Sequence, residues 1–308
     1  MKALVKKALQ SLRRWPVLFY GIRLLRPGKN IYQHLYFTGV IQVNVSDNAG
    51  FLVHHFGAKI ENELFWAGYG HGSEGYTLRL WRELCLRSRF IADIGANTGI
   101  YALAAAALNT NAEIIAIEPV PRIYNKLSSN IALNNFNIKA YKVAASDHDG
   151  ESIMFDTRQE HSYSASLEEI MSIEGGYTSE VVRTTVPTIR LDALFDEIQF
   201  ERIDLLKIDV ENHELKVLAG MRNRLDRDKP TLVIEIFDFG REAVAKLLTG
   251  LNYKFFAIDE NNGLIPIADL TDRVPGSSWN FLVCQDNIAQ ALPREIYTRK
   301  MKTFIAQT

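Results

Sequence analysis

Residues 90–101 contain the side chains best suited to chemistry. The segment reads Phe-Ile-Ala-Asp-Ile-Gly-Ala-Asn-Thr-Gly-Ile-Tyr, an apolar run with an acid at Asp93 that turns through Gly95 and Gly99 into an alanine-rich stretch. A buried strand, a glycine turn and a helix start place a ligand against free backbone N–H groups. The third glycine of the G-x-G-x-x-G dinucleotide fingerprint is absent. A carboxylate in this turn would repel a pyrophosphate, but it can accept hydrogen bonds from a ligand ammonium or its ordered waters.

A second acid follows at the spacing that a nucleoside requires. Residues 113–117 form another apolar run, and Glu118 stands at its tip. An acid roughly 20 residues beyond such a turn can hold both ribose hydroxyls. Either Asp93 or Glu118 alone is more typical of an acid that caps a helix. Together, around one glycine turn, they favour nucleoside binding, and the acidic turn suits the methionine half of S-adenosylmethionine.

Residues 206–214 are the second segment with candidate chemistry. Asp209 closes an apolar run, where a carboxylate is otherwise avoided, which predicts a functional group. Glu211 and Glu214 are individually more typical of helix caps, because acids offset the helix dipole. His213 is compatible with a proton acceptor and equally with a helix-surface residue.

Glu235 ends another apolar run and leaves two interpretations open. With Asp209 it could bind a divalent cation, since hard cations prefer oxygen ligands. Alternatively, it is a buried acid paired with Lys207 or an arginine. The sequence permits the cation and does not require it.

Repeated strand–helix units must position these acids. Apolar strands are expected at 89–94, 113–117, 138–144, 203–208, 230–236, 253–258 and 279–284, and helices at 77–87, 99–108, 121–134, 212–220 and 239–249. This alternation predicts a parallel sheet with helices on both faces. Ligands of such sheets bind beyond the carboxyl ends of the strands, so four strand-end acids are expected on one rim. They are Asp93, Glu118, Asp209 and Glu235.

The remaining segments are less regular. Residues 1–28 suggest one or two basic helices, and residues 33–67 suggest short strands at 36–39, 40–45 and 51–56. The glycine density of 66–76 is typical of a mobile loop. Two strand-like runs, 152–155 and 180–186, flank a polar loop at 156–179, and 259–278 is rich in turns. We expect an extension over residues 1–76 and the sheet domain over 77–308.

Composition indicates an ordinary globular protein. The chain has 308 residues, 47% of them hydrophobic, with 35 basic and 36 acidic side chains. Cys85 and Cys284 lie in apolar segments, which predicts buried thiols in a reducing, cytoplasmic compartment. No C-x-x-C or H-E-x-x-H pattern occurs, so a structural zinc site is not expected. Nucleic-acid binding is disfavoured, because no basic stripe with interleaved aromatics is present.

Charge is unevenly distributed along the chain. Residues 1–46 carry eight basic side chains and no acid, and because the total is −1 the remainder carries −9. The apolar stretch 15–22 is too short to span a bilayer, and no cleavage site follows it, which disfavours a signal peptide. Residues 1–28 therefore either lie on an anionic membrane or pack on the protein's own acidic body.

Several of these segments, in order, carry a family resemblance. Residues 36–284 resemble the FkbM-type methyltransferase family, which transfers methyl groups from S-adenosylmethionine, usually to hydroxyls. Besides residues 90–101 and 205–214, the shared motifs are Ile117-Glu-Pro119, Val143-Ala-Ala-Ser-Asp147 and Val186-Pro-Thr-Ile-Arg-Leu-Asp192. Asn212 departs from the glycine usual in the family, but asparagine tolerates a left-handed turn. The segment Ser73-Glu74-Gly75 also departs from the family pattern. This affects the contacts that the segment is expected to make as it closes over the cofactor.

The resemblance implies a Rossmann-like class I methyltransferase sheet and assigns the cofactor contacts. Gly95, Asn97 and Gly99 would approach the methionine moiety, with Asp93 nearby, and Glu118 would hold the ribose. Ser146 and Asp147 would sit beside the adenine, although a turn or helix cap explains them equally on spacing alone. Glu74 and Tyr76 would close over the cofactor.

The implied reaction needs alignment and a base. A sulfonium methyl is already activated, so aligning acceptor oxygen, methyl and sulfur supplies roughly 7–11 kcal/mol. The hydroxyl must also lose a proton, to Asp209, His213 or Glu211, or its pKa must be lowered by a cation at Asp209 and Glu235. Residues 66–76, 156–179 and 259–278 are expected to line the open side, where four polar side chains would suit a polyol. They are Ser162, Tyr163, Ser164 and Ser166.

We therefore expect O-methylation of a sugar, a glycan or another hydroxylated metabolite. Two alternatives stay open. One is a nicotinamide-dependent oxidoreductase on a similar sheet, disfavoured by the missing glycine and by Asp93. The other is a non-catalytic protein that binds membrane surfaces through residues 1–28. The sequence does not indicate the oligomeric state.

Overall fold

The computed structural model describes residues 16–157, 166–167 and 181–297. Its centre is an eight-stranded sheet in the order β12-β11-β13-β10-β9-β3-β4-β5. The strands are β3 (Phe90–Ile94), β4 (Glu113–Ile117), β5 (Ile138–Tyr141), β9 (Leu205–Ile208), β10 (Thr231–Glu235), β11 (Lys254–Asp259), β12 (Gly263–Ile267) and β13 (Asn280–Cys284). From β10 to β5 neighbouring strands are parallel, whereas β13, β11 and β12 pair antiparallel. The predicted α/β Rossmann-like sheet is confirmed.

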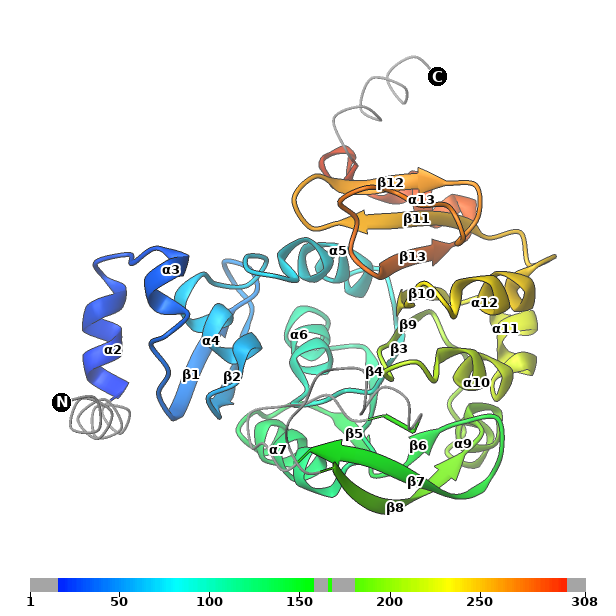
Figure 1. Ribbon diagram of the computed structural model, residues 1–308, viewed down its shortest axis with the longest axis horizontal. Helices are drawn as coiled ribbons and strands as arrows, with labels where there is room; N and C mark the ends of the chain where they lie inside the picture. Colours follow the sequence, from blue (N-terminus) through cyan, green and yellow to red (C-terminus); the bar gives the residue numbers. More distant parts are fainter. Residues whose placement is uncertain (1–15, 158–165, 168–180, 298–308) are drawn as a thin grey trace.

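Helices cover both faces of this sheet (Figure 1). They are α5 (Gly75–Cys85), α6 (Ile100–Leu108), α7 (Pro121–Ala132), α9 (Leu191–Glu197), α10 (Glu214–Ala219), α11 (Arg222–Asp228), α12 (Arg241–Leu248) and α13 (Asp286–Ala291), with a short 3-10 turn at Arg294–Ile296. Successive side chains of β3 face opposite ways: Ile91 joins the apolar cluster that contains α5 and α6, and Ala92 joins the one that contains α9 to α12. Two cores on one sheet explain why its strands are almost continuously apolar.

The N-terminal extension contains α2 (Pro16–Arg23), α3 (Lys29–Tyr32), a hairpin of β1 (Gly39–Asn44) and β2 (Gly50–His55), and α4 (Lys59–Trp66). The hairpin confirms the strands expected at 40–45 and 51–56, whereas residues 36–38 are not a strand. A helix at α4 was not expected. It begins where the Ala58 N–H donates to the Glu61 carboxylate at 2.9 Å, and it buries Leu64 and Phe65.

Side-chain amides attach this hairpin to the sheet domain. Asn134 and Asn130 accept hydrogen bonds from the β2 N–H groups of Leu52 and His54 at 2.8 and 2.9 Å. Asn130 also donates to the carbonyl of Thr98 at 2.7 Å. Through Asn130, the extension therefore touches the turn that follows β3. The division of the chain at residues 76 and 77 stays a prediction.

Between β5 and β9 the chain leaves the central sheet and forms a second, smaller sheet. β6 (Ala144–Ala145), β7 (Gly150–Thr157) and β8 (Val181–Ile189) pair in the order β6-β8-β7. The expected strand 138–144 is therefore divided, because β5 belongs to the central sheet and β6 to the small one. The turn-rich stretch 259–278 contains β12, which the sequence analysis missed.

Within the described ranges, every helix is too short or too polar to cross a bilayer. In and after α2, Val17, Leu24 and Leu25 expose about four fifths of their surface. Contact of residues 1–28 with an anionic membrane stays a prediction, and residues 1–15 lie outside the described part. Cys85 and Cys284 are buried free thiols, as expected.

Candidate active site

The turn after β3 needs its glycines for close packing. Gly95 has φ 76°, and a Cβ there would lie 1.9 Å from the carbonyl oxygen of Asp209. Gly99 has φ 90°, and its Cβ would lie 2.6 Å from Leu127 of α7. Gly99 caps α6 and does not line the cavity described below. Gly99 therefore has a packing role, whereas Gly95 lines the cavity, and the approach of these glycines to a ligand stays a prediction.

The two acids that flank this turn accept backbone hydrogen bonds. Asp93 is 1% exposed and accepts from the N–H of Ala102 in α6 at 3.1 Å. Glu118 accepts from the N–H groups of Asn97 at 3.1 Å and Val120 at 2.9 Å. Burial raises the pKa of Asp93 and of Glu118 to about 7 in each case. Both side chains therefore titrate near neutral pH, far above ordinary carboxyls.

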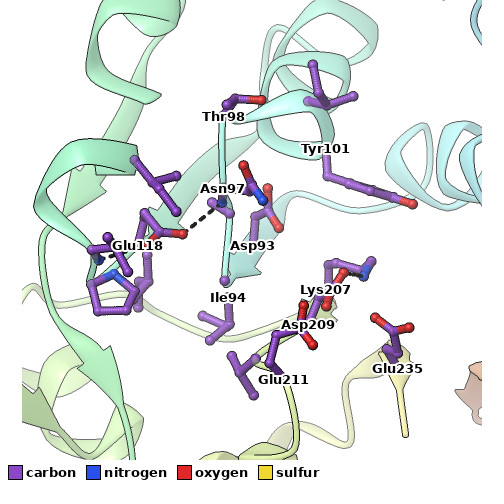
Figure 2. A pocket seen from close by; sticks show the side chains of 18 of the residues that line it. Asp93, Ile94, Asn97, Thr98, Tyr101, Glu118, Lys207, Asp209, Glu211 and Glu235 are labelled. Carbon is purple, nitrogen blue, oxygen red and sulfur yellow. Dashed lines mark hydrogen bonds and ion pairs between the residues drawn. The ribbon is translucent and has the colours of Figure 1, made fainter. Parts of the chain in front are cut away.

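A cavity of about 550 Å³ opens beyond the carboxyl ends of β3, β4, β9 and β10 (Figure 2). Its volume lies within the range of small-molecule and cofactor sites. Among the predicted residues, those that line it share the strand ends, the turns after them and the start of α5. They are Asp93, Gly95, Asn97, Glu118, Asp209, Glu211, His213, Glu235 and Glu74.

Asn97 provides a specific sign of a ligand. Its backbone is left-handed, with φ 53°, and its side-chain oxygen is buried. That oxygen has no hydrogen-bond partner among the described residues. Because a buried acceptor without a donor costs roughly 1–3 kcal/mol, a ligand that donates to it would stabilise the turn.

The other side of the cavity is formed by three residues that we call the Lys207 cluster. They are Lys207, Asp209 and Glu235. Lys207 is 2% exposed, and its Nζ lies 2.9 Å from Asp209 and 5.0 Å from the ring centroid of Tyr101. A side-chain hydrogen bond also joins Glu235 to Asp209. Figure 2 shows the cluster across the cavity from Glu118. The sequence indicates Lys207 only as a partner of Glu235. Its one visible signal was a lysine inside an apolar strand.

The protonation states within the cluster follow from burial and charge. Burial acts to raise the pKa of Asp209, but the Lys207 ammonium and hydrogen bonds hold it below its ordinary value. Burial and the neighbouring Asp209 raise the pKa of Glu235 to about 10. Burial would lower the pKa of Lys207, but three carboxyl groups, led by Asp209, hold it well above its ordinary value. At neutral pH the cluster therefore contains an ammonium, a carboxylate and a neutral acid.

This arrangement does not support the divalent cation considered for Asp209 and Glu235. Lys207 already supplies the positive charge between the acids, which agrees with the alternative of a buried lysine partner. In the part of the chain that the structure describes, no group of three His, Cys, Asp or Glu residues could hold a metal ion.

The loop after β9 brings Glu211 and His213 to the cavity. Glu211 and Asn212 are both left-handed, with φ 53° and 76°, so asparagine does adopt the turn for which the family usually has glycine. His213 is buried, and its Nε2 lies 3.0 Å from the hydroxyl of Ser146. The carbonyl of Glu211 accepts from Ser166 at 2.6 Å.

Ser146 and Asp147 do not line the cavity, and their place beside the adenine stays a prediction. The Ser146 N–H bonds to Ile189 of β8, and its hydroxyl faces His213. The hydrogen bond from His148 lowers the pKa of Asp147, whose side chain is exposed. The neighbouring Ala144 and Ala145 line the cavity in their place.

The two residues expected to close over the cofactor, Glu74 and Tyr76, lie in different places, and their contact with the cofactor stays a prediction. Glu74 accepts a hydrogen bond from Tyr101 at 2.7 Å, and burial raises its pKa. Gly75 allows this turn, because a Cβ there would lie 2.9 Å from the Gly70 carbonyl. Tyr76 does not line the cavity and instead packs its ring against Gly263.

The open side of the cavity differs from the expectation in two further ways. None of 259–278 lines it, because β12 turns that segment away along the sheet edge, whereas Ala58, Lys59 and Ile60 at the start of α4 do. Ser162, Tyr163 and Ser164 lie outside the described residues. Ser166 is described but bonds to the Glu211 carbonyl, and its neighbour Leu167 lines the cavity.

Comparison with known proteins gives one matching family model and several relatives. Residues 93–260 match the model of the methyltransferase FkbM domain. Methyltransferase sdnD of Sordaria araneosa is 32% identical over 159 residues, which cover 43% of this chain and 60% of that protein. Hexuronic acid methyltransferase AglP of Haloferax volcanii is 28% identical over 148 residues (48% and 56%). The 31-O-demethyl-FK506 methyltransferase FkbM of Streptomyces tacrolimicus is 27% identical over 172 residues (48% and 65%).

These matches span less than two thirds of each relative's length. The match to the family model, in contrast, covers more than half of this chain and includes the turn after β3, the Lys207 cluster and the loop after β9. The chain therefore belongs to the FkbM methyltransferase family.

Proposed function

We propose that this protein transfers the methyl group of S-adenosylmethionine to a hydroxyl oxygen of a sugar, a glycan or another hydroxylated metabolite. The observation that carries the proposal is one cavity with Glu118 on one side and the Lys207 cluster on the other. The relatives whose names specify an acceptor are a hexuronic acid methyltransferase and a 31-O-demethyl-FK506 methyltransferase, which agrees with an oxygen acceptor.

The described residues fit the methyl donor. Each carboxylate oxygen of Glu118 accepts one backbone N–H, so each retains a lone pair for a ribose hydroxyl. The unpartnered oxygen of Asn97 suits the donor's ammonium. Ala144, Ala145 and Met154 offer an apolar surface for a flat base. When bound, the donor supplies a methyl group that is already electrophilic.

Asp209 is the base that the geometry favours. Its carboxylate stays ionised because Lys207 holds its pKa low, and it lines the cavity. It would accept the acceptor's hydroxyl proton as the oxygen bonds to the methyl carbon and the carbon–sulfur bond breaks. One ring nitrogen of His213, Nε2, lies at hydrogen-bond distance from the Ser146 hydroxyl. Glu235, neutral at pH 7, holds Asp209 in place through their hydrogen bond.

Transfer itself is tested with a donor that carries a deuterated methyl group. The purified protein is incubated with this donor and a cell extract, and products are analysed by mass spectrometry. We expect the label in an O-methyl ether of a hydroxylated compound. Label on nitrogen or carbon would contradict the proposed acceptor class. Thermal stabilisation by NAD and not by S-adenosylmethionine would favour the oxidoreductase instead.

Replacement of Glu118 tests the donor site. We expect Glu118→Ala to weaken S-adenosylhomocysteine binding by about 1–3 kcal/mol, since ribose hydroxyls and two backbone N–H groups lose their acceptor. In the wild-type protein, binding should strengthen as pH rises through about 7, because Glu118 becomes a better acceptor when it ionises. Calorimetry between pH 6 and 8 measures both effects.

Two further variants distinguish the loss of the ribose contact from a general loss of folding. Glu118→Gln retains one acceptor oxygen and should bind with less dependence on pH than the wild type. Glu151→Ala removes an exposed acid of β7 and should bind normally. Equal affinities of Glu118→Ala and the wild type would contradict the ribose assignment.

A further inference from the structure

Three aromatic rings gather at the surface near the end of β10. Phe239 and Trp279 are 71% and 50% exposed, which is unusual for large aromatic side chains. The Phe237 ring lies 4.7 Å from the ring of Trp279 and 6.5 Å from that of Phe239, centroid to centroid. The rings of Phe237 and Phe239 are nearly parallel, at 8°. We call Phe237, Phe239 and Trp279 the aromatic platform.

Backbone pairing joins this platform to the cavity. Glu235, the last residue of β10, lines the cavity and pairs with Asn280 of β13. One step further, the N–H of Ile236 donates to the carbonyl of Trp279 at 2.8 Å. The platform therefore continues the carboxyl edge of β10, where ligands of open α/β sheets bind.

The platform also lies on the acceptor side of the cavity. Figure 2 shows Glu235 beyond Asp209 as seen from Glu118. In the sheet, β10 and β13 are separated by β9 and β3 from β4, the strand that precedes Glu118. A compound that rests on the platform thus approaches Asp209 and Glu235 first. In the proposed reaction, the hydroxyl must lie beside Asp209, which accepts its proton.

We propose that the aromatic platform is an acceptor subsite that stacks on the apolar face of a sugar ring. The inference rests on the proposed methyl transfer and specifies its substrate as a pyranose. The C–H face of such a ring matches the negative face of an aromatic ring. Asp238, 65% exposed at its side chain and 3.0 Å from Arg241, supplies polar atoms for the ring hydroxyls at the same edge.

Neighbouring carboxyl groups favour a sugar over a lipid surface. Glu235 lies beside the platform, and the exposed carboxylate of Asp238 stands between Phe237 and Phe239 in the chain. These carboxyl groups would be costly against an anionic or apolar membrane but can bond to hydroxyls. An aromatic plane beside carboxyl groups matches a ring that is apolar on its face and polar around its edge.

The test measures binding to an immobilised panel of pyranose oligosaccharides, with the protein saturated by S-adenosylhomocysteine. We expect the wild type to bind a subset of the panel. Trp279→Ala and Phe239→Ala should each weaken that binding by about tenfold. Trp279→Phe should retain most of it, and Tyr20→Ala, which removes a half-exposed aromatic side chain of α2, should not change it.

Donor binding distinguishes the subsite from the proposed function as a whole. Calorimetry with S-adenosylhomocysteine should give wild-type affinity for both platform variants. Full panel binding by Trp279→Ala and Phe239→Ala would overturn the subsite, and so would a wild type that binds no sugar on the panel. Labelled methyl transfer to a hydroxyl of a compound without a sugar ring would overturn the subsite and leave the proposed function standing.

Discussion

Asp209→Asn is expected to lower kcat for methyl transfer by about 10²–10⁴-fold, the usual loss when a general base is removed. The amide is the same size as the carboxylate but cannot accept a proton at neutral pH. Donor affinity should stay close to that of the wild type, because the groups proposed to hold the donor's ribose and ammonium, Glu118 and Asn97, are untouched. Single-turnover rates with labelled donor, and calorimetry with S-adenosylhomocysteine, measure the two quantities separately.

Matched variants identify which candidate is the base. Glu211→Gln and His213→Gln remove the other two proton acceptors, and Asp226→Asn changes an exposed acid of α11 as the control. We expect the control to be normal and both alternatives to lose less activity than Asp209→Asn. A loss below about tenfold in Asp209→Asn, or a larger loss in His213→Gln, would remove Asp209 from this role.

The pH dependence of wild-type kcat adds an independent check. Because the pKa of Asp209 is held below its ordinary value, the base is already ionised at mildly acidic pH. The kcat value should therefore stay constant between pH 6 and 8. An acidic limb with a midpoint near 7 would instead indicate one of the acids with raised pKa values, such as Asp93 or Glu214.

The central sheet could be predicted because its signals are local. β3 and β4 are short apolar runs, and the glycine turn and helix start that follow β3 are readable in adjacent residues. The sequence does not predict β12, α4, α9, α11 or α13, and the first two show why. β12 contains Pro266, which reads against a strand, and it is held by pairing with β11. α4 depends on a cap by Glu61 and on packing of Leu64 and Phe65 against the extension.

The sequence predicts which strand ends supply the residues of the site. The sequence could not show that a Cβ at Gly95 would strike the Asp209 carbonyl, because that contact joins two separate motifs. It also could not show which way a side chain faces at a strand end. Ser146 turns toward His213 and away from the cavity, although it directly follows two cavity residues. Local spacing locates the rim, whereas tertiary contacts decide which side chains reach it.

Lys207 is the residue for which tertiary context matters most, and its replacement should have the largest effect on stability. We expect Lys207→Met to lower the free energy of unfolding by about 3–5 kcal/mol, the cost of leaving a buried charge without its partner. Methionine fills a similar volume, but Asp209 would then be a carboxylate without a cation, beside Glu235 and Glu74. Its pKa should rise, so activity should also acquire a new acidic limb.

Urea denaturation measures this loss, with Lys246→Met of the exposed face of α12 as the control. In the double variant Lys207→Met/Asp209→Asn both charges are gone, so much of the stability should return. The two effects should then be strongly non-additive, as expected for groups in contact. A single-variant loss below about 1 kcal/mol, or two losses that simply add, would mean that the Lys207–Asp209 pair does not stabilise the site. In that case the low pKa of Asp209, on which its role as base depends, would lose its physical cause.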